Sequence, residues 1–229
     1  MQDTVFLVAL LIPCLIVAIV FHEVAHGYMA MLLGDPTAAE RGRLTLNPLR
    51  HVDPVGTLLV PGALLLVGAP AFGWAKPVPV NQFRLRNPRY GMMAVALAGP
   101  ASNFVLAALG AVLIGVLGAI NGASILDGEN VVGVVLTMFL LINIFLGLFN
   151  LLPIPPFDGS HIVGGLLPDR LRFHWARLQQ MGIFLLIGVI AYSWWFGTGW
   201  LETLLLPPLG LAMEVFLTLA DRVSALLGL

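Results

Sequence analysis

The chain is organised around the sequence Phe21-His22-Glu23-Val24-Ala25-His26-Gly27. It lies in the second half of an almost wholly apolar segment that runs from Val5 to Leu33. That segment is long enough to cross a bilayer as one helix. Apart from the two histidines and Glu23, it contains no acidic, basic or imidazole side chain. Because charge in lipid is costly, these polar groups require a functional reason.

The spacing of the two histidines predicts a metal site. On a helix, His22 and His26 lie one turn apart and project from the same face. Such a pair can hold one zinc ion (Zn2+) through ring nitrogens, while Glu23, rotated off that axis, can reach an attacking water. A chance match in a surface helix is the alternative, and the apolar surroundings of the motif disfavour it.

Composition places the chain in a membrane. Of its 229 residues, 59% are hydrophobic and only 10% are charged, more apolar surface than a soluble domain can bury. The net charge of -1 excludes a nucleic-acid binder of the basic-patch kind. Cys14 is the only cysteine, so we expect no internal disulfide and a small packing residue there. Repeats and long linkers are absent, so we expect residues 1–229 to form a single membrane-embedded domain.

Apolar stretches between turn signals predict an all-α polytopic membrane protein with about five transmembrane helices. We expect them at Val5–Leu33, Pro88–Ile120, Val131–Leu152, Leu178–Phe196 and Leu204–Leu219.

A shorter apolar segment, Val55–Ala69, begins after an Asp53-Pro54 cap signal and is broken by a Pro-Gly pair. It is shorter than the ~20 residues that a full crossing needs, so we expect a re-entrant or half-buried segment. A small β element is expected near it. Arg41–Leu46 alternates like a short strand, and the prolines in Phe72–Val80 permit only an edge strand.

Charge placement predicts the orientation. The basic residues lie between the first helix and the one after Pro88, in one later loop (Arg170–Arg177) and near the C-terminus, while the two other loops carry no Lys or Arg. By the positive-inside rule, the N-terminus is outside and the C-terminus is cytoplasmic. His22 is 17 residues past Val5, about 25 Å along a helix. We therefore expect the metal site in the cytoplasmic half of the bilayer.

A catalytic zinc needs a third protein ligand. Asp158 is favoured, because it follows the cytoplasmic end of the Val131–Leu152 helix and irregular backbone can fold back to that depth where it lines a cavity. The alternative is that Asp158 caps a short helix that starts near Gly159. His161, one turn further on, is either a ligand or a loop histidine.

Other polar residues are expected away from the metal. His51 and His174 lie among basic loop residues and should be solvated, and Glu214 lies in the last crossing. Asn150 could donate a hydrogen bond to an oxyanion or bond to a neighbouring helix. Asn103 is expected to make a helix–helix contact.

Three motifs together resemble the site-2 protease family of intramembrane zinc metalloproteases (peptidase family M50). They occur in the family's order, over about Val5 to Gly165: the His22–His26 motif, Gly99-Pro100-Ala101-Ser102-Asn103, and Asn150-Leu151-Leu152-Pro153 leading to Phe157-Asp158-Gly159. The resemblance implies that His22, His26 and Asp158 are metal ligands, that Glu23 is the general base and that Asn150 assists substrate or oxyanion binding. The chain looks like the compact subgroup without PDZ or CBS domains.

The resemblance and the residues together predict an intramembrane zinc endopeptidase that acts in regulated intramembrane proteolysis. Its partners would be a transmembrane protein substrate and the lipid bilayer, without nucleic acid. A substrate helix unwound in lipid loses hydrogen bonds, which an edge strand around Gly73 to Ala75 could replace. An interfacial loop is the alternative for that segment. The rival function is a membrane metal transporter or metal-binding scaffold that uses the same histidines.

Overall fold

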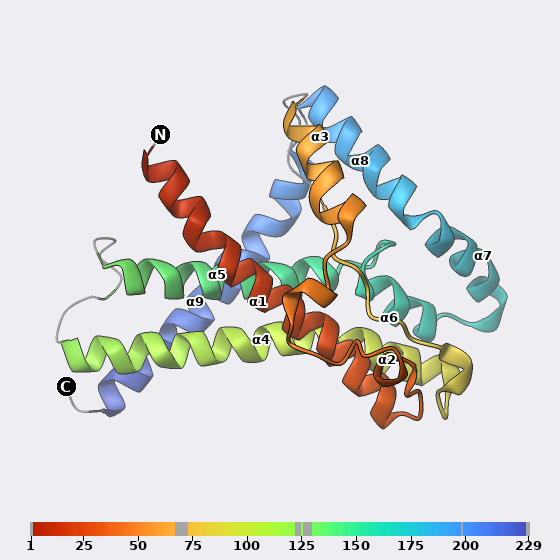
Figure 1. Ribbon diagram of the computed structural model, residues 1–229, viewed down its shortest axis with the longest axis horizontal. Coiled ribbons are helices and arrows are strands. Elements are labelled where there is room, and N and C mark those ends of the chain that lie inside the picture. The colour runs from red at the N-terminus through yellow and green to blue at the C-terminus, as the bar shows by residue number, and fades with distance from the viewer. Residues whose placement is uncertain (1, 67–72, 122–124, 126–129, 198, 228–229) are drawn as a thin grey trace. The chain divides into compact units, whose positions relative to one another are not determined.

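The computed structural model describes residues 2–66, 73–121, 125, 130–197 and 199–227. Four of its helices are long and apolar enough to cross a membrane (Figure 1): α1 (Gln2–Leu32), α4 (Pro88–Asn121), α5 (Val131–Asn150) and α9 (Trp200–Leu226). A fifth span exists if α7 (Asp169–Gln180) and α8 (Gly182–Phe196), which are bent by 64° relative to each other, count as one. The prediction of an all-α polytopic membrane protein is confirmed.

The chain divides into two compact units. The first comprises Met1–Ala18, Ala101–Phe149 and Leu204–Leu229, and the second comprises Ile19–Pro100 and Asn150–Thr203. Helices α1 and α4 each contribute residues to both units. The prediction of one domain stays a prediction.

The first unit is a helical core in which small residues permit close packing. Ala107 and Ala111 of α4 are fully buried and cluster with Leu140 and Ile144 of α5. Asn103 is fully buried, and its Nδ2 donates to the carbonyl of Ala18 (3.2 Å) and to Oδ1 of Asn143 (2.9 Å). The predicted helix–helix contact of Asn103 is therefore confirmed. Cys14 is buried and packs against Ile142 of α5, so the predicted packing role is confirmed.

In the second unit, glycine and side-chain caps mark the helix ends. Helix α1 ends at Leu32, and Gly34 adopts a φ of 110° that suits glycine. The Asp53 carboxylate accepts the first N–H groups of η2 (Pro54–Leu59), and Asn87 Oδ1 does the same for α4. The short helices α2 (Thr37–Glu40), η1 (Pro48–Arg50), η3 (Gln82–Arg84) and α6 (Asp158–Leu166) complete the unit.

The segment expected to re-enter the membrane is helical and short. It consists of η2, with six residues, followed directly by α3 (Val60–Leu66), with seven. Together they extend about 20 Å, less than the ~30 Å of a hydrocarbon core. Residues 67–69 of the predicted segment lie outside the described residues.

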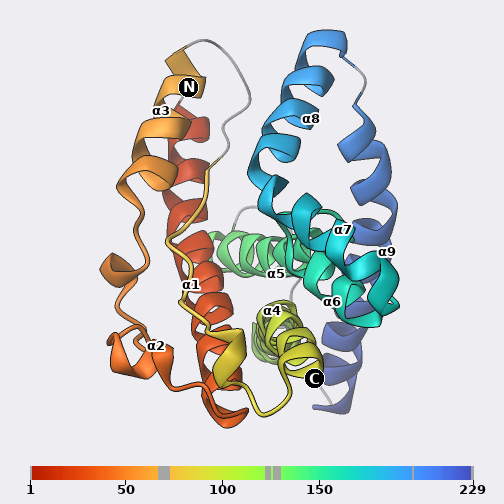
Figure 2. The ribbon, with the colours of Figure 1, turned by 90° about the vertical axis from the view of Figure 1, so that its right-hand side faces the viewer.

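Neither predicted strand is present in the part of the chain that the structure describes. Residues 41–46 form a turn and coil, and residues 73–81 follow an extended path without a strand partner (Figure 2). The backbone N–H groups of residues 73–81 form hydrogen bonds outside any strand ladder: Trp74 N donates to Gly56 O and Lys76 N donates to His51 O. Pro77 and Pro79 have no N–H, so a regular ladder cannot form. Phe72 lies outside the described residues.

Asp35 joins the end of α1 to this extended segment. Its side chain is fully buried and accepts hydrogen bonds from the backbone N and the hydroxyl of Thr37 and from the backbone N of Asn81 (2.6 Å). Burial raises the pKa of Asp35, but the hydrogen bonds from Thr37 and Asn81 outweigh it, so the pKa lies below its ordinary value.

We expect Asp35→Asn to lower the free energy of unfolding by about 2 kcal/mol at neutral pH, because charge-assisted hydrogen bonds are lost. The folded pKa of Asp35 lies below its unfolded value of about 4. The stabilisation is therefore complete above pH ~4 and is lost as the pH falls through the folded pKa. Thermal melting of the purified protein against pH measures both effects, with the exposed Asp221→Asn as control. If the difference in melting temperature between the parent and Asp35→Asn stays constant into strong acid, this role of Asp35 is contradicted.

Candidate metal centre

The second unit brings three predicted ligands together. His22 and His26 are buried on the same face of α1, with exposed fractions of 7% and 9%, and their ring centroids are 4.6 Å apart. Asp158 is the first residue of α6, and its Oδ2 lies 3.1 Å from His22 Nε2 and 3.3 Å from His26 Nε2. The three candidate ligand atoms all lie within 4.8 Å of one another.

The chemistry of this donor set fits a metal ion. His26 Nδ1 lies 2.7 Å from the carbonyl of Val95, which can only accept, so Nδ1 carries the proton and Nε2 faces the cluster with its lone pair. Asp158 Oδ2 is buried without a hydrogen-bond partner, although both histidine nitrogens are within ion-pair distance. Ligands at ~2.1 Å around a tetrahedral zinc lie about 3.4 Å apart. The observed separations from Oδ2 are close to that value.

Gly99 creates the space in which the two imidazoles lie. A Cβ atom at Gly99 would be 2.5 Å from Cε1 and Nε2 of His26 and 2.6 Å from Cε1 of His22. Any side chain at this position of α4 would therefore displace the candidate ligands. The sequence marked Gly99 only as part of a family motif, and its contact with the histidines became visible in the structure.

Helix α6 is fixed near both ends, which holds Asp158 in place. Gly159 lies so close to the end of α5 that a Cβ there would be 2.3 Å from the carbonyl oxygen of Leu151. Trp175 Nε1 donates to Ser160 O (2.8 Å), and the Arg89 guanidinium of α4 donates to the carbonyls of Gly165 and Leu167. The alternative role of Asp158 is not observed, because Phe157 is the N-cap residue and no side chain caps α6.

Glu23 contacts the extended segment of residues 73–81. Its Oε2 accepts a hydrogen bond from the backbone N of Val78 at 2.7 Å. Gly27 permits this approach, because a Cβ there would be 2.9 Å from Cγ1 of Val78. Val78 is buried and lies between Pro77 and Pro79, so it supplies the only N–H of these three residues. No sequence signal pointed to this contact.

The structure shows where two further histidines, His161 and His51, lie. His161 lies outside the ligand cluster, and its Nδ1 is 3.3 Å from Gln179 Nε2. Burial lowers the pKa of His161 below its ordinary value, against the opposing effect of the Asp158 carboxylate. The prediction that His51 is solvated is wrong: it is 3% exposed, and its Nε2 is 2.8 Å from the carbonyl of Thr45. The coil that precedes His51 folds back over the ring.

Three further polar residues were considered in the sequence: His174, Glu214 and Asn150. His174 is exposed on α7, and Glu214 is exposed on α9 in the first unit. Asn150 is the last residue of α5 and is half-buried. Its role in substrate or oxyanion binding stays a prediction.

Comparison with known proteins gives consistent matches. The family model of "Peptidase family M50" matches residues 10–191. A Bacillus subtilis protein named "Putative zinc metalloprotease YwhC" is 39% identical over 181 residues, covering 78% of this chain and 80% of the relative. A Mycolicibacterium smegmatis protein named "Putative zinc metalloprotease Rip2" is 30% identical over 188 residues, covering 79% and 67%. Rip2 of Mycobacterium tuberculosis H37Rv is 31% identical, covering 80% and 68%. No solved structure matches the chain significantly.

The contact of Gly99 with both imidazoles predicts that Gly99→Ala weakens metal binding. We expect a loss of affinity of about 10- to 100-fold, the range for changes that disturb ligand orientation. Metal analysis of the purified variant after equilibration with a zinc buffer measures it. Gly118→Ala is the matched control, because it lies on the same helix and its Cβ would have no neighbour closer than 4.0 Å. Equal zinc affinity of the two variants would show that Gly99 does not support the site.

Proposed function

Because the chain belongs to peptidase family M50, we propose that it is a zinc endopeptidase that cleaves the transmembrane segment of a membrane-protein substrate. The carrying observation is the convergence of His22, His26 and Asp158, with two of the three donors on a helix apolar enough to span the bilayer. A substrate peptide bond within the membrane would then be the nearest target. A metal transporter or scaffold is not favoured, because the polar groups meet at one point rather than along a route.

The roles of the side chains follow from their positions. His22 Nε2, His26 Nε2 and Asp158 Oδ2 would hold zinc, which supplies a Lewis acid that polarises the scissile carbonyl and acidifies an attacking water. Glu23 takes the proton of that water and delivers it to the leaving nitrogen. The Val78 N–H fixes the orientation of the Glu23 carboxylate through Oε2. Asn150 assists binding of the substrate or the oxyanion.

The proposed orientation places the N-terminus outside and the C-terminus in the cytoplasm. It rests on the distribution of Lys and Arg in the loops. His22 then lies in the cytoplasmic half of the bilayer. A cleaved substrate would release its cytoplasmic part from the membrane, which is how such a protease transmits a signal.

We expect Glu23→Gln to retain zinc and the fold but to lower the cleavage rate by at least about 100-fold, because the ligands remain and the general base is lost. Quantitative membrane proteomics of cells that carry the parent or the variant identifies the substrate as a membrane protein that accumulates uncut. His22→Ala serves as the comparison that loses zinc. If Glu23→Gln loses as much zinc as His22→Ala, the assignment of roles is wrong.

The hydrogen bond between Val78 and Glu23 predicts a selective effect of Val78→Pro. Removing the N–H leaves the zinc ligands intact but frees the carboxylate, so we expect a fall in cleavage rate on the order of tenfold or more. The pH profile of cleavage should also shift. Val78→Ala is the matched control, since it keeps the N–H. Rates and zinc contents of both are measured on the substrate found above, and an unchanged rate for Val78→Pro would remove the contact from the mechanism.

A further inference from the structure

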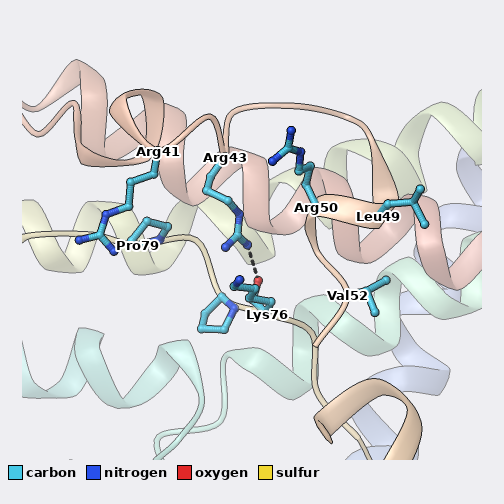
Figure 3. A pocket seen from close by; sticks show the side chains of 8 residues that line it. Arg41, Arg43, Leu49, Arg50, Val52, Lys76 and Pro79 are labelled. Carbon is cyan, nitrogen blue, oxygen red and sulfur yellow. Dashed lines mark hydrogen bonds between the residues drawn. The ribbon is translucent and has the colours of Figure 1, made fainter. Parts of the chain in front are cut away.

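Four basic side chains surround a hollow in the second unit that the proposed reaction does not use. Arg41, Arg43, Arg50 and Lys76 line a space of about 610 Å³ together with Leu49. Figure 3 shows these side chains. The rest of the lining is apolar and includes two prolines of the extended segment. Its size lies within the range of small-molecule sites.

The four cations have no acidic counter-charge among the described residues. No lining residue is acidic, and none of the four takes part in an ion pair there. The acids nearby in sequence are used elsewhere. Glu40 pairs with Arg84 at 2.6 Å, Asp35 is bonded to Thr37 and Asn81, and Asp53 caps η2. The hollow therefore carries uncompensated positive charge.

Arg43 shows that this charge is buried as well as clustered. Its exposed fraction is 8%, and one terminal nitrogen donates to the carbonyl of Lys76 at 2.7 Å. Its Nε is buried without a hydrogen-bond partner. An unused buried donor on a guanidinium is costly. A guanidinium is also the side chain that binds phosphate oxygens in a bidentate manner.

We propose that this hollow binds the phosphate group of an anionic phospholipid headgroup. The apolar part of the lining decides the source of the phosphate. Leu49 and the neighbouring Leu46 are 78% and 56% exposed, and the loop that carries them begins shortly after α1 leaves its candidate span at Leu32. A lipid offers glycerol and acyl carbons to these side chains, whereas a free phosphate leaves them in water. The proposal does not rest on the protease activity.

The test uses the full-length protein purified in micelles of a non-ionic maltoside detergent, which carries no phosphate, and titrated with phosphatidylglycerol. Native mass spectrometry counts the retained lipid. Arg41→Gln/Arg50→Gln removes two exposed cations of the hollow without touching the Arg43 to Lys76 bond, and should weaken retention about tenfold. Arg170→Gln/Arg222→Gln is the matched control with the same charge change on exposed residues outside the lining, and should change retention less than about twofold.

The outcomes separate the alternatives. The site is supported if Arg41→Gln/Arg50→Gln weakens phosphatidylglycerol retention and the control double variant does not. Arg43→Gln should weaken retention as well, in protein that still melts cooperatively. Equal losses in both double variants would reduce the effect to general surface charge and overturn it. Displacement of phosphatidylglycerol by excess inorganic phosphate at constant ionic strength would overturn the lipid as the source.

Discussion

The convergence of two buried imidazoles and one carboxylate is the constraint on which the second unit depends. Two imidazole nitrogens and a carboxylate oxygen face one another, and burying these groups is costly unless a proton or a metal ion lies between them. It dictates the local backbone. Gly99 must lack a side chain so that α4 can pass the imidazoles, and the chain after α5 must fold back tightly enough to bring Asp158 to them.

The extended segment of residues 73–81 shows how the same unit satisfies buried charge without a sheet. Three charged side chains bind its backbone: Arg43 at the Lys76 carbonyl, Glu23 at the Val78 N–H and Asp35 at the Asn81 N–H. These bonds take the place of a β ladder, which explains why a strand-like sequence forms none. Each bond also compensates a buried or half-buried charge with an oriented backbone dipole.

The sequence predicted those features that depend on residues close together in the chain. The histidine spacing and the Asp53 cap depend on neighbours within a turn or two, and the structure agrees with them. Asp158 could be selected because a zinc site would require a third ligand. The contacts of Val78 with Glu23 and of Gly99 with the imidazoles join residues 55 or more positions apart, and no periodic pattern encodes them. His51 was misplaced for the same reason: its basic neighbours suggested water, but the coil before it folds over the ring.

The position of the Glu23 carboxylate therefore depends on residues outside the His22–His26 motif. Pro77 and Pro79 restrict φ on both sides of Val78, so the segment from Lys76 to Asn81 has little freedom to adjust. Arg43 holds one end of this stiff segment and Asp35 holds the other. The Val78 N–H that meets Glu23 lies between these two anchors. A change at Arg43 or Asp35 would therefore move the carboxylate of Glu23 through the backbone of this segment.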